Sequence, residues 1–280
     1  AIIAVSYLTA KNIIVGGPGL NESNSFKDCN VTAIIYDYRK VQFLNNDVSN
    51  TQPNPPLGYT GSGTTGISVN HVNNFNNTLV TIKNYKFSKV NYPINYYFAN
   101  QTNINNDNYD ISDNKIDGET NLKGIRGIFI KGNLINSTIS GANSFTVFNN
   151  DIKKMQVGIA LYNLSGIQSV VEENKIDINW GNSLTRIGID TRFSNSQYLY
   201  NNDVRGPGFS LAEAGFVGIR TESSDKTTIL CNKIKKFGQS LYFKGTTPSF
   251  VHGNIFTNAY DGWVMGPNAV IGQQGDPSFA

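Results

Sequence analysis

Two neighbouring segments carry charged residues at matching positions and are the best candidate for chemistry in the sequence. They read GIDTR from residue 188 and GIRTE from residue 218, so Asp190 aligns with Arg220 and Arg192 aligns with Glu222. Carboxylates beside guanidinium groups could bind or cleave a sugar chain. The same pairing on adjacent strands is also a structural ion-pair ladder, which contributes about 0.2–1 kcal/mol per pair. We favour the structural ladder and keep a polysaccharide lyase or glycoside hydrolase site as the alternative.

A second group of acidic residues could hold a metal ion. Its members are Asp107, Asp110, Asp113 and Asp117. Calcium prefers oxygen ligands, so these four carboxylates are the candidates for a Ca²⁺ site. We favour solvated loop carboxylates, and therefore expect no cofactor, with Ca²⁺ as the alternative.

The histidines and cysteines offer no recognisable site. His71 and His252 have no companions at the spacing of metal ligands, and no Ser-His-Asp order or phosphate-binding loop occurs. Cys29 and Cys231 are far apart, and neither belongs to a CxxC motif. A zinc site is therefore not expected. We predict two buried free thiols, with a disulfide as the alternative.

Aromatic side chains and one long loop are the remaining candidates for binding. Exposed tyrosines can stack on sugars, but we expect most of the aromatic residues between 85 and 98 to pack in the core. The loop at residues 52–66 is rich in Pro and Gly, which marks an exposed excursion that could lie on a binding face. The aromatic residues in question are Tyr85, Tyr92, Tyr96, Tyr97 and Phe98.

The elements that must position these residues follow from the composition. The 280 residues include 39 Asn and 27 Gly but only 6 Glu and 2 Met. Asn and Gly favour turns and left-handed bends, whereas helices favour Ala, Leu, Glu and Met. A helical protein is therefore excluded, and many short strands joined by tight turns are expected.

One phrase recurs along the chain: β-branched or aromatic residues, then Asn, any residue, and an aliphatic residue or Phe. It appears as VQFLNNDV, YDISDNKI, FTVFNNDI, SVVEENKI, QYLYNNDV, TTILCNKI and SFVHGNIF, with LVTIKNYKF as a degenerate copy. A second phrase, Gly followed by an aliphatic or aromatic residue, alternates with it. The anchor asparagines of the first phrase are Asn46, Asn114, Asn150, Asn174, Asn202, Asn232 and Asn254.

The spacing of the anchors indicates a coil with fixed strands and variable loops. From Asn150 to Asn254 the intervals are 24, 28, 30 and 22 residues. This unit is too short for a propeller blade, and a sandwich would not repeat the phrase. We predict an all-β, right-handed parallel β-helix of about 8–10 coils with 22–39 residues per coil, stacked about 4.8 Å apart. It forms one domain, residues 1–280, which we expect to belong to a longer chain.

Two physical roles are expected for each anchor asparagine. Its backbone tolerates a left-handed conformation at the corner of a coil. Its amide offers donors and an acceptor, so stacked copies could bond along the rod as a structural ladder. The glycine of the second phrase suits a position where a side chain would clash or φ must be positive.

The alternating GIxV and NxI phrases resemble the repeats of the pectate-lyase-like superfamily. A likeness to pectate lyases implies a calcium-binding acidic cluster with a basic residue nearby, and a likeness to polygalacturonases implies several Asp and a His on adjacent coils. The Asn-rich form, and above all the ending GNIFTNAYDGWVMGPNAVIGQQGDPSFA, is similar to large secreted surface proteins of Bacteroidota. That likeness implies export by the type IX secretion system, through a C-terminal sorting domain absent from these residues.

The expected function is a non-enzymatic extracellular rod, a stalk or adhesin segment on the bacterial or outer-membrane surface. Its partners would be a glycan or a host or cell-surface ligand. A third hypothesis is a substrate of the type IX machinery captured with that outer-membrane machinery. The net charge of +3 without a basic stripe argues against nucleic-acid binding, and no apolar run is long enough for a transmembrane segment.

Overall fold

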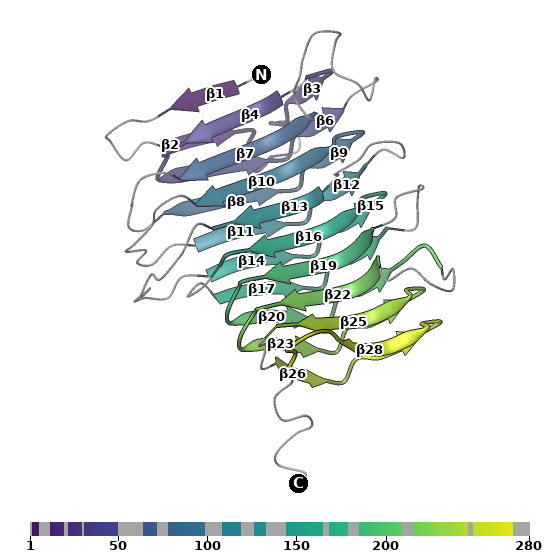
Figure 1. Ribbon diagram of the computed structural model, residues 1–280. Coiled ribbons are helices and arrows are strands. Elements are labelled where there is room, and N and C mark those ends of the chain that lie inside the picture. Colours follow the sequence, from purple (N-terminus) through teal and green to yellow (C-terminus); the bar gives the residue numbers. More distant parts are fainter. Residues whose placement is uncertain are drawn as a thin grey trace, which may run out of the picture.

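In a computed structural model, the described part of the chain forms many short strands joined by turns (Figure 1). The predicted all-β class is confirmed, because the part of the chain that the structure describes contains strands and no helix. It therefore contains no helix that could cross a membrane. The described residues are 2–5, 12–19, 22–29, 31–49, 64–71, 78–98, 108–118, 126–132, 144–164, 168–178, 185–208, 215–245 and 249–270.

The strands form three parallel sheets, here called A, B and C, and each coil contributes one strand to each sheet in that order. Sheet A contains β1 (Ile2–Val5), β4 (Val31–Tyr36), β7 (Thr65–His71), β10 (Tyr92–Phe98), β13 (Arg126–Lys131), β16 (Val157–Tyr162), β19 (Arg186–Arg192), β22 (Phe216–Glu222), β25 (Gln239–Lys244) and β28 (Asp261–Met265). Sheet B contains β2 (Asn12–Val15), β5 (Lys40–Leu44), β8 (Leu79–Lys83), β11 (Asn108–Ser112), β14 (Ser144–Phe148), β17 (Gln168–Glu172), β20 (Gln197–Tyr200), β23 (Thr227–Leu230) and β26 (Ser249–His252). Sheet C contains β3 (Ser25–Lys27), β6 (Asp47–Ser49), β9 (Lys86–Ser88), β12 (Lys115–Asp117), β15 (Asp151–Lys153), β18 (Lys175–Asp177), β21 (Asp203–Arg205), β24 (Lys233–Lys235) and β27 (Ile255–Thr257).

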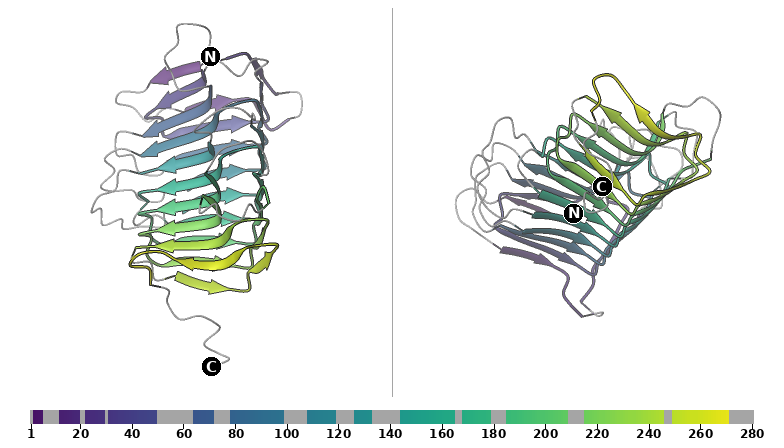
Figure 2. Two further views of the ribbon diagram at one scale, coloured as in Figure 1. Left: turned by 45° about the vertical axis from the view of Figure 1, so that its right-hand side comes forward. Right: turned by 90° about the horizontal axis from the view of Figure 1, so that it is seen from below.

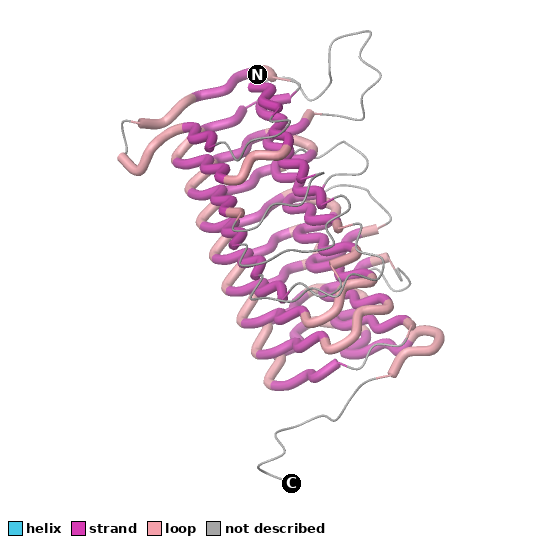
Figure 3. Tube along the Cα trace, turned by 90° about the vertical axis from the view of Figure 1, so that its left-hand side faces the viewer, coloured by secondary structure: helices cyan, strands magenta, loops and turns pink. Residues whose placement is uncertain are grey.

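Successive coils stack in register, and every adjacent pair of strands in the three sheets is parallel (Figures 2 and 3). The described residues make about nine coils, within the predicted 8–10. The predicted loop at 52–66 lies mostly outside the described residues, and its last two residues, Thr65 and Gly66, already belong to β7.

Alternation along each strand places one set of side chains inside the coil and the other outside. In β19, Ile187 and Ile189 are buried, and Ile189 stacks between Ile159 and Ile219 of the neighbouring coils. In sheet C the aliphatic residue of each NxI phrase fills the interior in the same way. The result is one continuous apolar core that no single coil could bury alone.

The glycines of the second phrase are required by close packing between sheets A and C. A Cβ built on Gly158 would lie 2.5 Å from Cγ2 of Ile176, and one on Gly188 would lie 2.1 Å from Cγ1 of Val204. Neither glycine has a positive φ. Of the two reasons expected for these glycines, steric clash is therefore the right one.

The anchor asparagines lie at the two-residue corner between sheets B and C, and their backbone is not left-handed. The prediction of a left-handed anchor is wrong, because the positive φ belongs to the preceding residue: Asn149 has φ 51°, Glu173 has 55° and Asn201 has 53°. That residue turns the chain outward, so the anchor side chain points into the core. The anchors from Asn46 to Asn232 are almost fully buried.

The buried amides form a ladder along the rod. Each Nδ2 donates to Oδ1 of the anchor in the next coil, at 2.9 Å from Asn114 to Asn150 and from Asn150 to Asn174. The remaining links, from Asn174 through Asn202 and Asn232 to Asn254, are 2.9–3.0 Å long. The backbone N–H of each anchor donates to the same oxygen. The ladder therefore links the coils from Asn114 to Asn254.

Two members of the ladder could not be recognised as anchors. Tyr85 occupies the anchor position of the degenerate phrase, where its hydroxyl accepts from Nδ2 of Asn46 at 2.6 Å and its N–H donates to Oδ1 of Asn114. Asn24 extends the ladder upward, since its Nδ2 donates to Oδ1 of Asn46 at 2.9 Å.

The thiols differ from the expectation of buried cysteines. Both are free, as predicted, but Cys231 is exposed and Cys29 is partly exposed. Cys231 holds the left-handed corner position before Asn232, with φ 54°, and that backbone turns its side chain toward water. Buried free thiols were therefore the wrong prediction.

His71 is a buried titratable group in the upper part of the core. Its Nε2 lies 3.0 Å from the carbonyl oxygen of Tyr38 and so carries the proton, while Nδ1 accepts from the Tyr96 hydroxyl. Burial lowers the pKa of His71 from 6.5 to about 4, and the Tyr38 carbonyl only partly opposes this. The imidazole is therefore neutral in the folded rod.

We predict that Asn174→Ala destabilises the rod by about 3 kcal/mol, because it removes the Oδ1 that accepts from the backbone N–H and from Nδ2 of Asn150 in the core. Urea unfolding followed by circular dichroism measures the change. Asn108→Ala, at an exposed position of β11, is the matched control and should change stability by less than about 0.5 kcal/mol. Equal effects of the two substitutions would contradict a stabilising ladder.

We predict that stability falls as the pH drops from 6.5 to about 4. In this window His71 is protonated in the unfolded chain but not in the folded chain. Its full contribution to the free energy of unfolding is therefore present only above pH 6.5. The pKa difference corresponds to about 3 kcal/mol. Urea midpoints at several pH values give the slope, which should shrink in His71→Gln and persist in His252→Gln. An unchanged slope in His71→Gln would refute the assignment.

Candidate functional site

The four predicted charged residues meet on the outer face of sheet A. The register pairs Asp190 of β19 with Arg220 of β22, and Arg192 with Glu222, as the aligned segments predict. These outward positions alternate with the inward Ile189 and Thr191, which fixes the side on which the charges lie.

Asp190 is the centre of the group. Arg220 binds it in a bidentate manner, with Nε 2.8 Å from Oδ1 and Nη2 2.7 Å from Oδ2. Arg192 approaches from the same strand, with Nη2 3.1 Å from Oδ2. Tyr162 of β16 donates its hydroxyl to Oδ2 at 2.5 Å. Two guanidinium groups and one phenol therefore enclose a single carboxylate.

The enclosing groups are themselves held by neighbours on adjacent strands. The guanidinium of Arg192 lies 5.0 Å from the centre of the Tyr162 ring, and that of Arg126 lies 4.3 Å from the centre of the Phe129 ring, both within cation–π range. Glu222 pairs with Lys244 at 2.8 Å and is 3.8 Å from Arg192. The network thus runs across sheet A from β13 to β25.

Burial dominates the electrostatics of this group. The Asp190 side chain is 0% exposed, whereas those of Arg220 and Arg192 are 17% and 33% exposed. Burial raises the pKa of the Asp190 carboxyl, and the Arg192 guanidinium opposes that shift. A catalytic carboxylate must reach its substrate. Asp190 is instead covered by its own ion pairs, so the arrangement is suited to holding three coils together.

The predicted calcium ligands do not converge where the structure describes them. Asp113 pairs with Lys83 at 3.1 Å, and Asp117 pairs with Lys154 at 2.9 Å in a different sheet. Asp110 lies on the outer face of sheet B, and Asp107 lies outside the described residues. No group of three metal-binding side chains occurs among the described residues.

The outer face of sheet C carries charges that alternate in sign from coil to coil. One column reads Asp117, Lys153, Asp177 and Arg205 in direct register, and the alternation ends there because Lys235 follows Arg205. Exposed pairs of this kind contribute little energy individually. A register slip of two residues between β15 and β18 would place Lys153 beside Lys175 or Asp151 beside Asp177, so the pattern favours the observed register.

Of the five aromatic residues named between 85 and 98, two belong to the interior. Tyr85 and Tyr96 are fully buried, and Tyr96 packs against Phe145 with ring centres 5.3 Å apart. Tyr92 and Tyr97 are half-buried, and the side chain of Phe98 is outside the description. No sugar-stacking surface therefore forms from Tyr85 and Tyr96.

Exposed tyrosines instead occur on β20, where the sequence analysis had placed no site. Tyr198 is 41% exposed and Tyr200 is 40% exposed, while Leu199 between them is buried. The signal was present in the phrase QYLYNNDV, because its register directs Leu199 inward and both tyrosines outward.

Comparisons with known proteins give little further information. No protein-family description and no curated protein matches the chain. A similar solved structure is tailspike protein 3 of bacteriophage CBA120, at 11% identity and a TM-score of 0.27. The alignment covers 91% of this chain and 54% of the tailspike chain, so this chain spans about half of its length.

We predict that Asp190→Asn destabilises the rod by about 2–3 kcal/mol, because Asn offers one oxygen in place of the two that accept from Arg192, Arg220 and Tyr162. Asp203→Asn is the control: its carboxylate is 41% exposed and pairs with Lys235 at 2.9 Å, so it should cost at most about 1 kcal/mol. Thermal and urea unfolding measure both. A cost for Asp190→Asn no larger than that of the control would contradict a stabilising role.

Proposed function

We propose that the chain is a non-enzymatic extracellular rod, a stalk or adhesin segment of a large secreted protein on a bacterial surface. The observation that carries the proposal is the buried asparagine ladder, which links coil to coil over most of the described residues. Nine coils at about 4.8 Å each give a stack of roughly 40 Å. A structure of this kind suits spacing and display, because its stiffness comes from contacts repeated along one axis.

The charged group on sheet A also supports a structural role. In an enzyme that cleaves polysaccharides, a carboxylate would face a groove and remain available to substrate. Asp190 is fully buried, and Glu222 is paired with Lys244. A lyase or hydrolase at these residues therefore stays the weaker proposal.

Export belongs to the same proposal. The support is the similarity of the ending at residues 253–280 to secreted surface proteins of Bacteroidota, which implies passage through the type IX machinery at the outer membrane. Protease treatment of intact producing cells should remove the protein, and immunoprecipitation should recover outer-membrane translocon components with it. Complete protection in intact cells would argue against a surface location.

We predict that the purified protein releases no products from acidic or neutral polysaccharides. Unsaturated sugars, monitored by ultraviolet absorbance, report lyase activity, and new reducing ends report hydrolysis. Asp190→Asn and Arg220→Gln are assayed beside the unchanged chain and checked for folding by circular dichroism. Product formation that is lost in a folded Asp190→Asn variant would overturn the non-enzymatic proposal.

A further inference from the structure

The outer face of sheet B is polar in its middle coils and more apolar in its lower coils. One outward column begins with Ile14, which is 57% exposed, and continues as Gln42, Thr81, Asp110 and Thr146 in consecutive coils. The same column continues as Val170, Tyr198, Thr228 and Phe250. Outward positions of a solvated sheet are ordinarily polar. The lower coils therefore present an apolar surface that core formation does not require.

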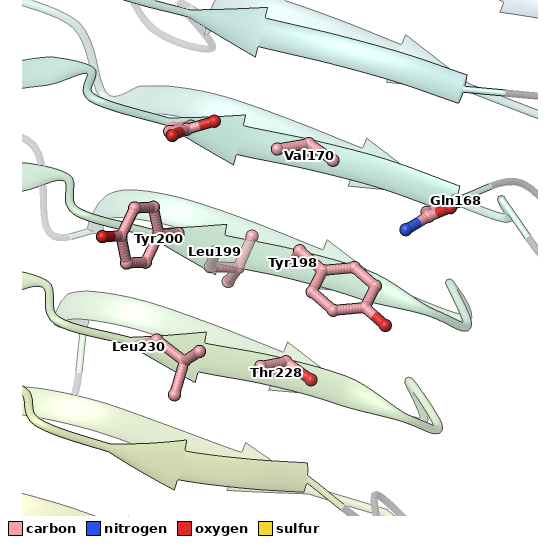
Figure 4. A pocket seen from close by; sticks show the side chains of 8 residues that line it. Gln168, Val170, Tyr198, Leu199, Tyr200, Thr228 and Leu230 are labelled. Atoms are coloured by element: carbon pink, nitrogen blue, oxygen red, sulfur yellow. The ribbon is translucent and has the colours of Figure 1, made fainter.

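Tyr198 and Tyr200 are the centre of this surface, and we call them the tyrosine platform. Figure 4 shows the two rings nearly face-on and side by side along β20. Residues two apart on a strand are separated by about 6.6 Å, so the rings cover adjacent areas of the surface. Neither phenol is hydrogen-bonded to any residue that the structure describes, so both hydroxyls are available to a ligand.

The platform borders a shallow depression of about 220 Å³. Val170 and Leu230 add apolar surface above and below the rings, and Gln168 and Thr228 contribute hydrogen-bonding groups at the margin (Figure 4). Glu172 also lines the depression. A pyranose ring has a matching character, with an apolar face of C–H groups and a rim of hydroxyls. Aromatic faces bordered by a few polar groups can therefore hold sugar rings flat on the sheet.

Charge and size narrow the choice of ligand. Among the described residues that line the depression, Glu172 is the one charged residue, and none of them is Lys or Arg. Glu173 follows directly at the corner, so an anionic sugar would meet repulsion. A protein partner typically needs about 800 Å² and 20–30 residues on each side. Eight of the residues that the structure describes line this depression, which suits a small part of a glycan chain better.

We propose that the tyrosine platform is a binding site for a neutral glycan chain. Tyr198 and Tyr200 stack on consecutive sugar rings, and Gln168, Glu172 and Thr228 bind their hydroxyls. The inference deepens the adhesin part of the proposed function and rests on it. It requires no catalysis, so a cleavage assay and a binding assay test the two proposals separately.

The test is isothermal titration calorimetry of the whole chain with cellohexaose, xylohexaose, mannohexaose and laminarihexaose. A hexamer of galacturonic acid is the acidic comparison. At least one neutral hexaose should bind, and the acidic one should bind at least about tenfold more weakly. Tyr198→Ala and Tyr200→Ala should each weaken binding about tenfold, and the double variant should abolish it. Tyr260→Ala, which removes a tyrosine that is 62% exposed elsewhere, is the matched control and should bind normally.

Three results would overturn the site. The first is that no neutral hexaose binds at millimolar concentration, and the second is that binding survives in the double variant. The third is a dimer, detected by analytical ultracentrifugation, that dissociates in the Tyr198→Ala variant. That result would show that the surface binds a second copy of the chain. Both rings face solvent, so the variants should remain folded. Thermal unfolding of each variant checks this. If no glycan binds, the glycan site is wrong but the stalk proposal is unaffected. If the protein cleaves a polysaccharide, the non-enzymatic stalk proposal is wrong, and the glycan site is still tested by the binding assay.

Discussion

The two-residue corner between sheets B and C is the constraint on which the rest of the fold depends. At this corner the chain must turn sharply while an amide side chain enters an apolar interior. A buried amide without partners is costly, and its partners belong to the coil before and the coil after. Each coil therefore supplies hydrogen-bond partners for the buried amides of its neighbours. The sheets are held in register by these polar contacts as well as by apolar packing.

The two repeated phrases are the two sides of one contact. The bare surface of each Gly in sheet A receives the aliphatic side chain that follows the anchor asparagine in sheet C, as Gly158 receives Ile176 and Gly218 receives Ile234. An added Cβ would force the sheets apart at that level. This explains why both phrases occur once in each coil although the loops between them differ in length.

The sequence allowed the architecture to be predicted because the phrases record contacts that recur in every coil. Contacts that occur once left no such record. Tyr162 reaches Asp190 from a strand whose phrase carries no charge, so the third partner of that carboxylate could not be anticipated. Tyr85 was grouped with neighbouring aromatics, whereas its hydroxyl completes the hydrogen bonds of Asn46. Burial depends on such single contacts, and for that reason the exposure of Asp190 and the cysteines could not be predicted.

The three edges of the rod differ in how they tolerate insertion. Between sheets B and C every connection from β5–β6 to β26–β27 has two residues, whereas residues 16–24 join β2 to β3, and Asn24 at their end still bonds to Asn46. The connections on either side of sheet A vary freely, from residues 89–91 to residues 50–64. Over evolutionary time, new loops can accumulate along the two margins of sheet A without disturbing any pairing. The edge between sheets B and C instead repeats the same two-residue corner from β5 to β27, so the ladder runs there from coil to coil without an intervening loop.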